Sequence, residues 1–213
     1  LPMVKGTNKA GLQIDDILLH QAGLVPFIAF YKETIDEKTG EPNPAIYRSK
    51  PEPGFTVRVA ENIYMRNDWE DTMFARILKS PLGPQNKYVY SDNDFIFLGK
   101  IVEQLSGMTL DQYVQKNIYS KIGLATTGYK PLNRFTKERI VPTEKDQFFR
   151  QQLLWGDVHD EGTSMFGGVA GHAGLFSTAY DLSMLYQMLL NGGEINGERI
   201  LNAETINYFT KYH

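Results

Sequence analysis

Tyr90, Ser91 and Asp92 stand directly before a segment whose apolar residues recur every three or four positions. A tyrosine can transfer a proton, a serine can act as a nucleophile, and a carboxylate can bind a donor group. The same residues also suit the start of a helix, because Ser91 with Asp94 three positions later forms a variant of the capping box, and Tyr90 could pack on Phe95 as a hydrophobic staple. Local physics therefore leaves two interpretations open, a helix cap and part of an active site.

A second group of polar residues lies among glycines further along the chain. His159, Asp160, Glu161 and His172 could in principle gather a metal ion, but their spacing matches no standard metal-binding motif. We therefore expect no metal site and no cofactor. We expect His159 and Asp160 to order this loop, whereas His172 either contacts a substrate or hydrogen-bonds within the loop.

Composition and missing signatures exclude several classes of function. The formal charge is -3 without any lysine- or arginine-rich tract, so we expect no nucleic-acid partner. No apolar run approaches the roughly 18 residues of a membrane span. The absence of cysteine excludes disulfides, thiol catalysis and cysteine-bound zinc, and leaves the compartment open. The dinucleotide, P-loop, zincin and nucleophile-elbow signatures are also missing.

The elements that must position these residues follow from periodicity and caps. We predict a strand pair over 55–65 and loops with short extended pieces over 121–177. We predict six helices: over 12–20, from Asn67 or Asp68 to before Pro81, from Ser91 to Gly107, from Thr109 to about Tyr119, from Thr178 to Asn191, and from Ala203 onward. In the helix after Thr178, the predicted apolar face carries Leu182, Leu185, Tyr186 and Leu189.

The predicted organisation is a single helix-rich unit over 1–213 with minor strand content. Four prolines and two glycines over 36–54 predict a proline-rich surface excursion, because proline resists both helix and central strand. The sequence begins within a segment rather than at a recognisable start of an element, and at Lys211 it ends inside a helical pattern. We therefore expect it to be cut from a longer polypeptide.

Taken in order, five segments closely resemble the serine beta-lactamase-like family, which includes class C beta-lactamases, penicillin-binding DD-peptidases and related esterases. The segments are Leu18-Leu-His-Gln-Ala-Gly-Leu24, Tyr88-Val-Tyr-Ser-Asp-Asn93 with 98–107, Ile122-Gly-Leu124, Val158-His-Asp-Glu161, and 167–179. The resemblance implies the helical subdomain of the beta-lactamase/transpeptidase-like α/β fold, mostly α, with most of the sheet missing. It also implies a periplasmic or secreted location.

The resemblance also assigns expected roles to particular residues. In the family, a serine in a Ser-x-x-Lys motif attacks a carbonyl carbon, and the lysine and the tyrosine of a Tyr-x-Asn motif transfer protons. Tyr90 falls on that tyrosine and Asp92 on the position that is commonly asparagine. An ionised aspartate cannot donate to a substrate carbonyl, but it can pair with the family lysine. The resemblance makes Tyr90 the catalytic candidate, makes Asp92, Gly171 and His172 substrate-binding candidates, and implies a structural role for His20.

Two family motifs are absent from the 213 residues. No serine has a lysine three positions later, and the Lys38-Thr39-Gly40 triplet lies upstream of Tyr90 rather than in the family's late strand. We therefore expect this chain alone to be inactive, and its full-length parent to hydrolyse a beta-lactam, cell-wall peptide or ester. The alternative is a non-catalytic binding or scaffold module, possibly fused to a cell-wall glycoside hydrolase. An unrelated helical protein with accidental similarity would instead bury the Tyr90 ring.

The expected partners follow from these alternatives. They are a small-molecule or peptidoglycan-derived substrate and the remainder of the parent polypeptide.

Overall fold

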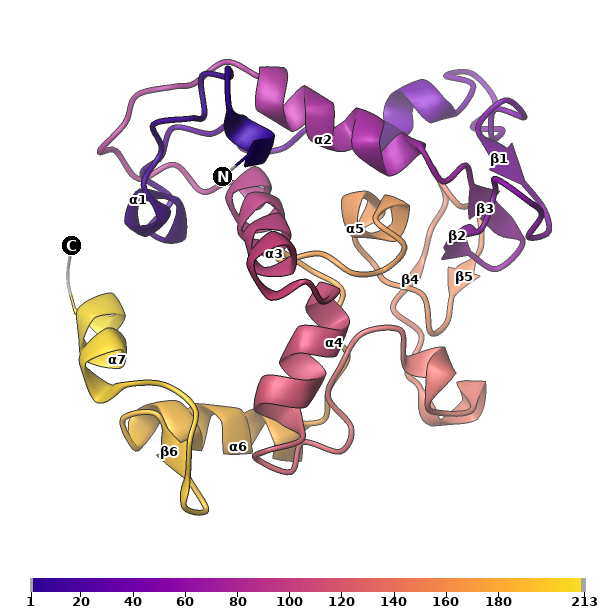
Figure 1. Ribbon diagram of the computed structural model, residues 1–213. Coiled ribbons are helices and arrows are strands. Elements are labelled where there is room, and N and C mark those ends of the chain that lie inside the picture. The colour runs from indigo at the N-terminus through magenta and orange to yellow at the C-terminus, as the bar shows by residue number, and fades with distance from the viewer. Residues whose placement is uncertain (1, 212–213) are drawn as a thin grey trace.

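The computed structural model describes residues 2–211, which form a mostly helical fold with three small antiparallel sheets (Figure 1). The helices are α1 (Ile14–Leu18), α2 (Trp69–Lys79), α3 (Asp92–Ser106), α4 (Leu110–Val114), α5 (Glu161–Met165), α6 (Ala179–Leu190) and α7 (Ala203–Thr210). The strands are β1 (Tyr47–Arg48), β2 (Val57–Ala60), β3 (Ile63–Met65), β4 (Glu144–Lys145), β5 (Leu153–Leu154), β6 (Glu194–Ile195) and β7 (Glu198–Arg199). The predicted fold class, mostly α with minor β, is confirmed.

The largest sheet has the strand order β1-β3-β2, and β3 pairs with both neighbours at Met65. The strands β2 and β3 are the pair predicted over 55–65. The strand β1 comes from the proline-rich segment 36–54 and lies at the edge, where prolines nearby do not interrupt a ladder on both sides. Buried Tyr47 fixes this edge, because its hydroxyl lies 2.8 Å from the hydroxyl of Thr34.

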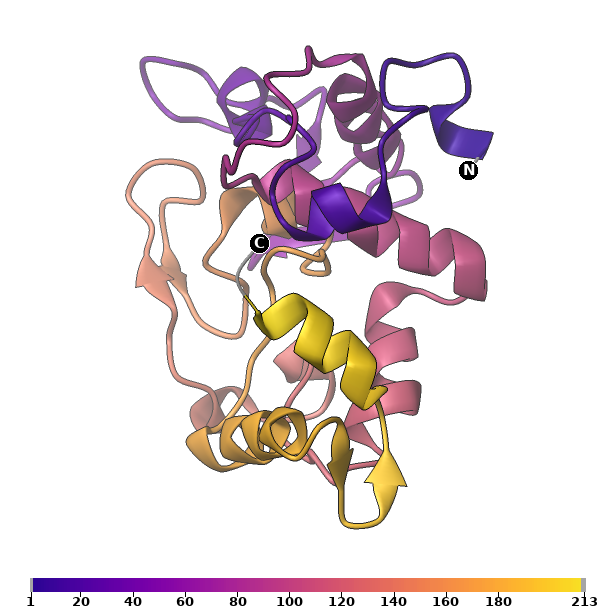
Figure 2. The same ribbon diagram turned by 90° about the vertical axis from the view of Figure 1, so that its left-hand side faces the viewer.

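Three hydrophobic clusters hold the fold together. The first joins the largest sheet to α2, α3 and α5 through residues such as Met65, Met73, Ile96 and Met165. The second packs Ile17 of α1 against α3, and the third packs α6 and β6 against the segment that follows α4. Because α3 contributes to the first two clusters, it is the central helix. Figures 1 and 2 show α3 and α4 connecting the end that carries α2 to the end that carries α6.

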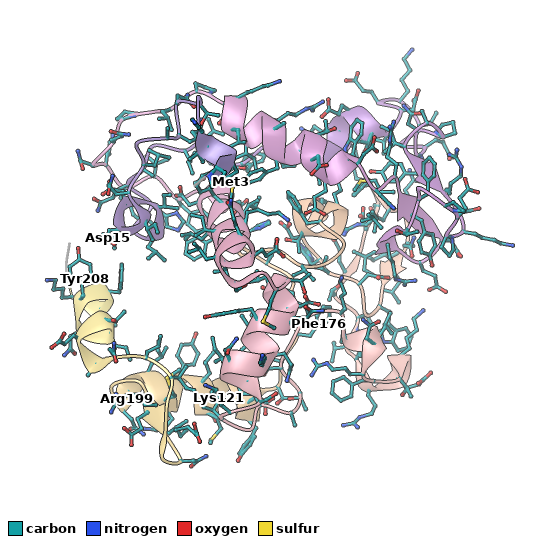
Figure 3. The ribbon with its side chains drawn as sticks, viewed as in Figure 1. Met3, Asp15, Lys121, Phe176, Arg199 and Tyr208 are labelled. Carbon is teal, nitrogen blue, oxygen red and sulfur yellow. The ribbon has the colours of Figure 1, made fainter. Side chains whose placement is uncertain are left out.

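The helix α7 lies on the same side of the molecule as α1. Figure 3 shows Tyr208 of α7 facing Asp15 of α1, and the two residues line one wide surface hollow with Gln13 and Leu19. No side chain of α7 is buried within the described residues. Among residues 2–211, no helix is both long enough and apolar enough to cross a membrane.

Three local predictions differ from the structure. Asp68 precedes α2 but does not cap it, because its carboxylate pairs with Arg66 at 2.5 Å. The helix after Thr109 leaves α-geometry early and ends in a π-helical turn over Gln115–Tyr119. The short helix α5 lies inside the segment 121–177, which was predicted to hold only loops and short extended pieces, because α5 is held by contacts to residues far away in the sequence that no local pattern shows.

The face of α6 also differs from the prediction. The helix begins as predicted, with Thr178 accepting a hydrogen bond from the Asp181 amide. Of the predicted apolar face, Leu185 and Leu189 pack against the third cluster, whereas Leu182 and Tyr186 are exposed. Met188, which was not part of the predicted face, is buried in that cluster, so periodicity identified only part of the buried side.

Candidate functional site

The start of α3 fixes the position of Tyr90. Ser91 has extended backbone angles and its hydroxyl accepts a hydrogen bond from the Asp94 amide at 3.3 Å, so the predicted cap is confirmed. The same hydroxyl donates to the carbonyl of Val25 at 2.7 Å, and Ser91 is fully buried. The Tyr90 side chain projects from this rigid start and is 58% exposed. This exposure is not what an accidental resemblance would give.

His20 supports the same helix start from a distant part of the chain. Its Nδ1 atom lies 2.8 Å from a carboxylate oxygen of Asp94 and 3.2 Å from the Ser91 amide nitrogen. Its ring contacts the rings of Tyr90 and Phe95, with centroids 4.7 Å and 5.2 Å away. Burial raises the pKa of Asp94 to about 6, although the hydrogen bond with His20 partly offsets this rise. His20 is therefore a structural support for the tyrosine, as the resemblance implied.

The environment of Tyr90 disfavours its phenolate form. Partial loss of hydration and the negative charge of Asp92 raise the pKa of Tyr90, and Tyr88 and Asp160 raise it further. An unperturbed tyrosine is already ionised in only about one molecule in a thousand at pH 7. Within residues 2–211, no lysine or arginine pairs with Tyr90 to reverse this effect. A base at this position needs positive charge from elsewhere.

His172 forms a buried hydrogen-bonded group with Asp160 and Thr163. Its Nε2 atom lies 3.0 Å from Oδ1 of Asp160 and 3.1 Å from the Thr163 hydroxyl, and its side chain is only 5% exposed. The Thr163 amide donates to the same Asp160 oxygen at 2.6 Å, which caps α5. Burial alone would raise the pKa of Asp160, but the hydrogen bonds from His172 and Thr163 outweigh it and lower the pKa to about 2.

Gly171 brings the glycine-rich segment against the side of α3. A Cβ atom on Gly171 would lie 2.0 Å from the carbonyl oxygen of Phe95, and one on Gly99 would lie 3.2 Å from the Gly171 amide. No other residue type fits at such close contact of two backbones. Gly171 thereby fixes the loop that carries His172 next to the helix that carries Asp92.

A cavity of about 150 Å³ lies where these elements meet. The sequence-predicted residues Asp92 and His172 both line it, whereas Tyr90 and Gly171 do not. Asp92 and Asp160 nevertheless act on Tyr90 electrostatically, so the cavity adjoins the tyrosine. The other lining residues are Phe27, Ile28, Ala29, Phe30, Tyr31, Asn93, Ile96, Asp160, Glu161 and Gly162.

Sequence reasoning missed Asn93, and it considered Asp160 and Glu161 as binding residues only in a metal cluster that it then rejected. Asn93 is fully buried in the first turn of α3, and its amide nitrogen donates to the Val25 carbonyl at 2.7 Å. The only local signal was its place beside the tyrosine motif. Among residues 2–211, no group of three or more histidine, aspartate or glutamate side chains is placed to hold a metal ion.

A larger cavity of about 360 Å³ lies between β2 and the segment around Lys130. Its wall includes the ion pair of Arg58 and Asp157, whose side chains meet at 2.8 Å. It contains none of the site residues predicted from the sequence. The smaller cavity is the stronger candidate site, because it contains two of them together with buried polar groups.

Comparison with known proteins identifies the family to which the chain belongs. The family model described as Beta-lactamase matches residues 1–212. A Salmonella typhimurium protein named "Putative D-alanyl-D-alanine carboxypeptidase" is 35% identical over 222 residues, which cover 98% of this chain and 45% of that protein. A Salmonella enteritidis protein of the same name is 34% identical, with the same coverage. The chain therefore spans a little under half the length of these curated relatives.

Solved structures share the fold at lower sequence identity. A beta-lactamase-like protein from Bacteroides dorei, titled "putative beta-lactamase", has a TM-score of 0.57 at 17% identity, with 97% of this chain and 45% of that chain covered. The octameric penicillin-binding protein homologue from Pyrococcus abyssi has a TM-score of 0.55 at 20% identity, covering 92% and 37%. The D-amino acid amidase from Ochrobactrum anthropi has a TM-score of 0.54 at 17% identity, covering 92% and 47%.

The resemblance drawn from the ordered motifs is thus confirmed by a family model over nearly the whole chain and by the fold. The helical elements around α3 correspond to the helical part of that fold. The chain belongs to the beta-lactamase family.

Proposed function

We propose that the full-length protein that contains this chain is a serine hydrolase that forms an acyl-enzyme, with Tyr90 in proton transfer. The observation that carries the proposal is the contrast at the start of α3. Tyr90 is 58% exposed, whereas Ser91, Asn93 and Asp94, which surround it in sequence, are at most 1% exposed. A residue that transfers protons must be accessible and held in one place, and this arrangement meets both requirements.

The proposed reaction begins with a serine outside these 213 residues, in a Ser-x-x-Lys motif of the parent. Its oxygen attacks the carbonyl carbon of an amide, lactam or ester, and its proton passes to the lysine and Tyr90 pair. Tyr90 then gives a proton to the leaving nitrogen or oxygen as the carbonyl bond reforms. Water then attacks the carbonyl carbon of the acyl-enzyme and gives its proton to the lysine and Tyr90 pair. The serine oxygen leaves and takes back a proton, which releases the acid and restores the enzyme.

The names of similar proteins support a substrate built from D-amino acids. The Salmonella relatives carry the name of a D-alanyl-D-alanine carboxypeptidase, and a fold relative is a D-amino acid amidase. For this protein we propose a cell-wall peptide or a related amide or ester. Asp92 and His172 would contact this substrate, and Gly171 would hold the loop of His172 in place.

This chain alone should have no activity. Partial loss of hydration and then the chain's own charges raise the pKa of Tyr90, and the positive charge that would lower it belongs to the lysine of the missing motif. The experiment is to treat the 213-residue chain and the full-length parent with a labelled penicillin and with a fluorophosphonate, and then to map adducts by mass spectrometry. We expect a serine adduct on the parent, upstream of Leu1, and none on the chain.

Two results would contradict the proposal. An adduct on a serine within the 213 residues would show that the chain carries its own nucleophile. A folded parent that reacts with neither reagent would support the non-catalytic binding or scaffold module instead.

A further inference from the structure

The larger cavity, between β2 and the segment around Lys130, has the size and lining of a small-molecule site. Its volume of about 360 Å³ lies within the range of about 300–1,000 Å³ that such sites occupy. It shares no lining residue with the smaller cavity. The apolar part of its wall includes Val57, Pro131, Leu132, Phe166 and Phe176, the last of which is labelled in Figure 3.

Arg58 keeps free hydrogen-bond donors in the wall of this cavity. Its Nε and Nη2 atoms donate to the two carboxylate oxygens of Asp157, each at 2.8 Å, and its Nη1 atom lies 3.5 Å from the Tyr64 hydroxyl. A guanidinium has five N–H groups, so one on Nη1 and one on Nη2 have no acceptor among residues 2–211. The bidentate pair with Asp157 fixes the plane of the guanidinium. The Arg58 side chain is 36% exposed, so a ligand can reach it.

Lys130 supplies a second cation, and this one has no acidic partner. Its side chain is exposed, lines the cavity, and forms no hydrogen bond or ion pair within the part of the chain that the structure describes. Its backbone is left-handed, with φ of 46°, directly before Pro131, and a residue with a side chain adopts this conformation only when its surroundings impose it. The neighbouring Tyr129 anchors the segment, because its hydroxyl donates to the Ala170 carbonyl at 2.8 Å.

The two sides of the cavity meet at a pair of glycines. A Cβ atom on Gly168 would lie 3.8 Å from the Cγ atom of Lys130. One on Gly167 would lie 3.5 Å from the side chain of Val57, which directly precedes Arg58 in β2. Both cations therefore belong to neighbouring parts of the wall.

The remaining charge of the wall opposes an anion at a different place. Apart from the carboxylate that holds Arg58, Glu70 is the acid that lines the cavity within the described residues. It pairs with Lys100, which also contacts Glu103 at 2.9 Å. Because one lysine is shared by two glutamates, the wall at Glu70 stays negative. An anionic group is thus favoured at Arg58 and Lys130 and disfavoured at Glu70.

We propose that this cavity binds a small organic carboxylate. Its carboxylate accepts from the free N–H groups of Arg58 and from the Lys130 ammonium, and its apolar part packs on Leu132 and Phe176. With Asp157 counted, two positive and two negative charges then face one another, so no charge is left unpaired on that side of the cavity. The inference does not rest on the proposed function, because binding requires no turnover.

The experiment is a ¹⁹F NMR titration of the full-length protein with 4-fluorobenzoate and with 4-fluorobenzamide, which has nearly the same shape and no charge. We expect a Kd of about 1 mM for the acid, as for about ten heavy atoms, and binding at least about tenfold weaker for the amide. Lys130→Gln should weaken binding of the acid about tenfold and leave the amide unchanged. The control Lys121→Gln, an exposed lysine outside the cavity wall, should change neither.

A second variant tests the apolar part of the wall. Leu132→Ala should weaken binding of the acid and of the amide alike, by about threefold, because both lose the same apolar contact. Circular dichroism checks that each variant keeps its fold. Lys130→Gln and Leu132→Ala together separate recognition of the charge from packing.

Three results would overturn the site. Equal Kd values for the acid and the amide would mean that the cavity does not select for negative charge. Equal effects of Lys130→Gln and Lys121→Gln would mean that the acid binds elsewhere on the protein. No saturable binding of the acid at about ten times the expected Kd would mean that the remainder of the parent polypeptide covers the cavity.

Discussion

Asp160 offers a test of how the site is held together, through the substitutions Asp160→Asn and Asp160→Ala. The carboxylate caps α5 and pairs with His172, and its pKa is lowered to about 2. An ordinary aspartate has a pKa of about 3.9, so the difference of almost two units corresponds to about 2 kcal/mol of folding stability at pH 7. Its side chain is 31% exposed, which keeps solvent screening moderate.

The sign follows from the direction of the shift. Because folding lowers the pKa of Asp160, the stabilisation is complete above pH 4 to 5 and is lost as pH falls toward 2, with about half gone by pH 3. Asp160→Asn keeps the cap, because asparagine caps as well as aspartate does, but removes the charge. Asp160→Ala removes both, which adds a pH-independent loss of about 1 kcal/mol.

The assay is urea denaturation followed by tryptophan fluorescence between pH 3 and pH 7. We expect Asp160→Asn to be about 2 kcal/mol less stable than wild type at pH 7 and about 1 kcal/mol less stable at pH 3. Asp160→Ala should lie about 1 kcal/mol below Asp160→Asn at every pH. The control Glu37→Gln should stay within about 0.5 kcal/mol of wild type. A difference between wild type and Asp160→Asn that does not change with pH would refute the charge-based reasoning.

Two further predictions concern α3. Gly171→Ala should destabilise the fold by about 3 kcal/mol or prevent folding, because the new Cβ would lie 2.0 Å from the Phe95 carbonyl oxygen. The control Gly11→Ala, whose new Cβ would have no atom within 4 Å, should have almost no effect in the same denaturation assay. Equal effects of the two substitutions would contradict the close contact at Gly171. Folding raises the pKa of Asp94 to about 6, so its carboxyl favours the folded state least above pH 6. Asp94→Asn should therefore gain on the order of 2 kcal/mol relative to wild type between pH 4 and pH 7, and a flat difference would argue against a buried, neutral carboxyl.

Local patterns predicted the elements that depend on local interactions. The cap of Ser91 with Asp94 was found in the sequence and exists, and the helix predicted from Thr178 does begin there, with Thr178 accepting a hydrogen bond from the Asp181 amide. Periodicity likewise found α2, α3 and α7 within a few residues. Where a competing local partner existed, the prediction was wrong, as at Asp68, whose carboxylate binds Arg66 instead of the helix end.

The site depends on contacts that local patterns do not contain. The bond between His20 and Asp94 joins residues 74 positions apart, so only the folded chain reveals it. The cavity likewise combines Asn93 with Glu161, which was assigned to a loop. The family resemblance identified Tyr90, Asp92 and His172 as residues of interest, but it gave no reason to consider the acceptors around them.

Tyr90→Phe in the full-length protein is the most direct test of the central claim. The measurement is the second-order rate of acylation by labelled penicillin, with circular dichroism and thermal unfolding as controls for the fold. Because only the hydroxyl of a largely exposed side chain is removed, the account predicts an unchanged fold and acylation slower by about 100- to 10,000-fold, the usual contribution of a proton-transfer residue. An acylation rate within about threefold of wild type would contradict the assignment of proton transfer to Tyr90.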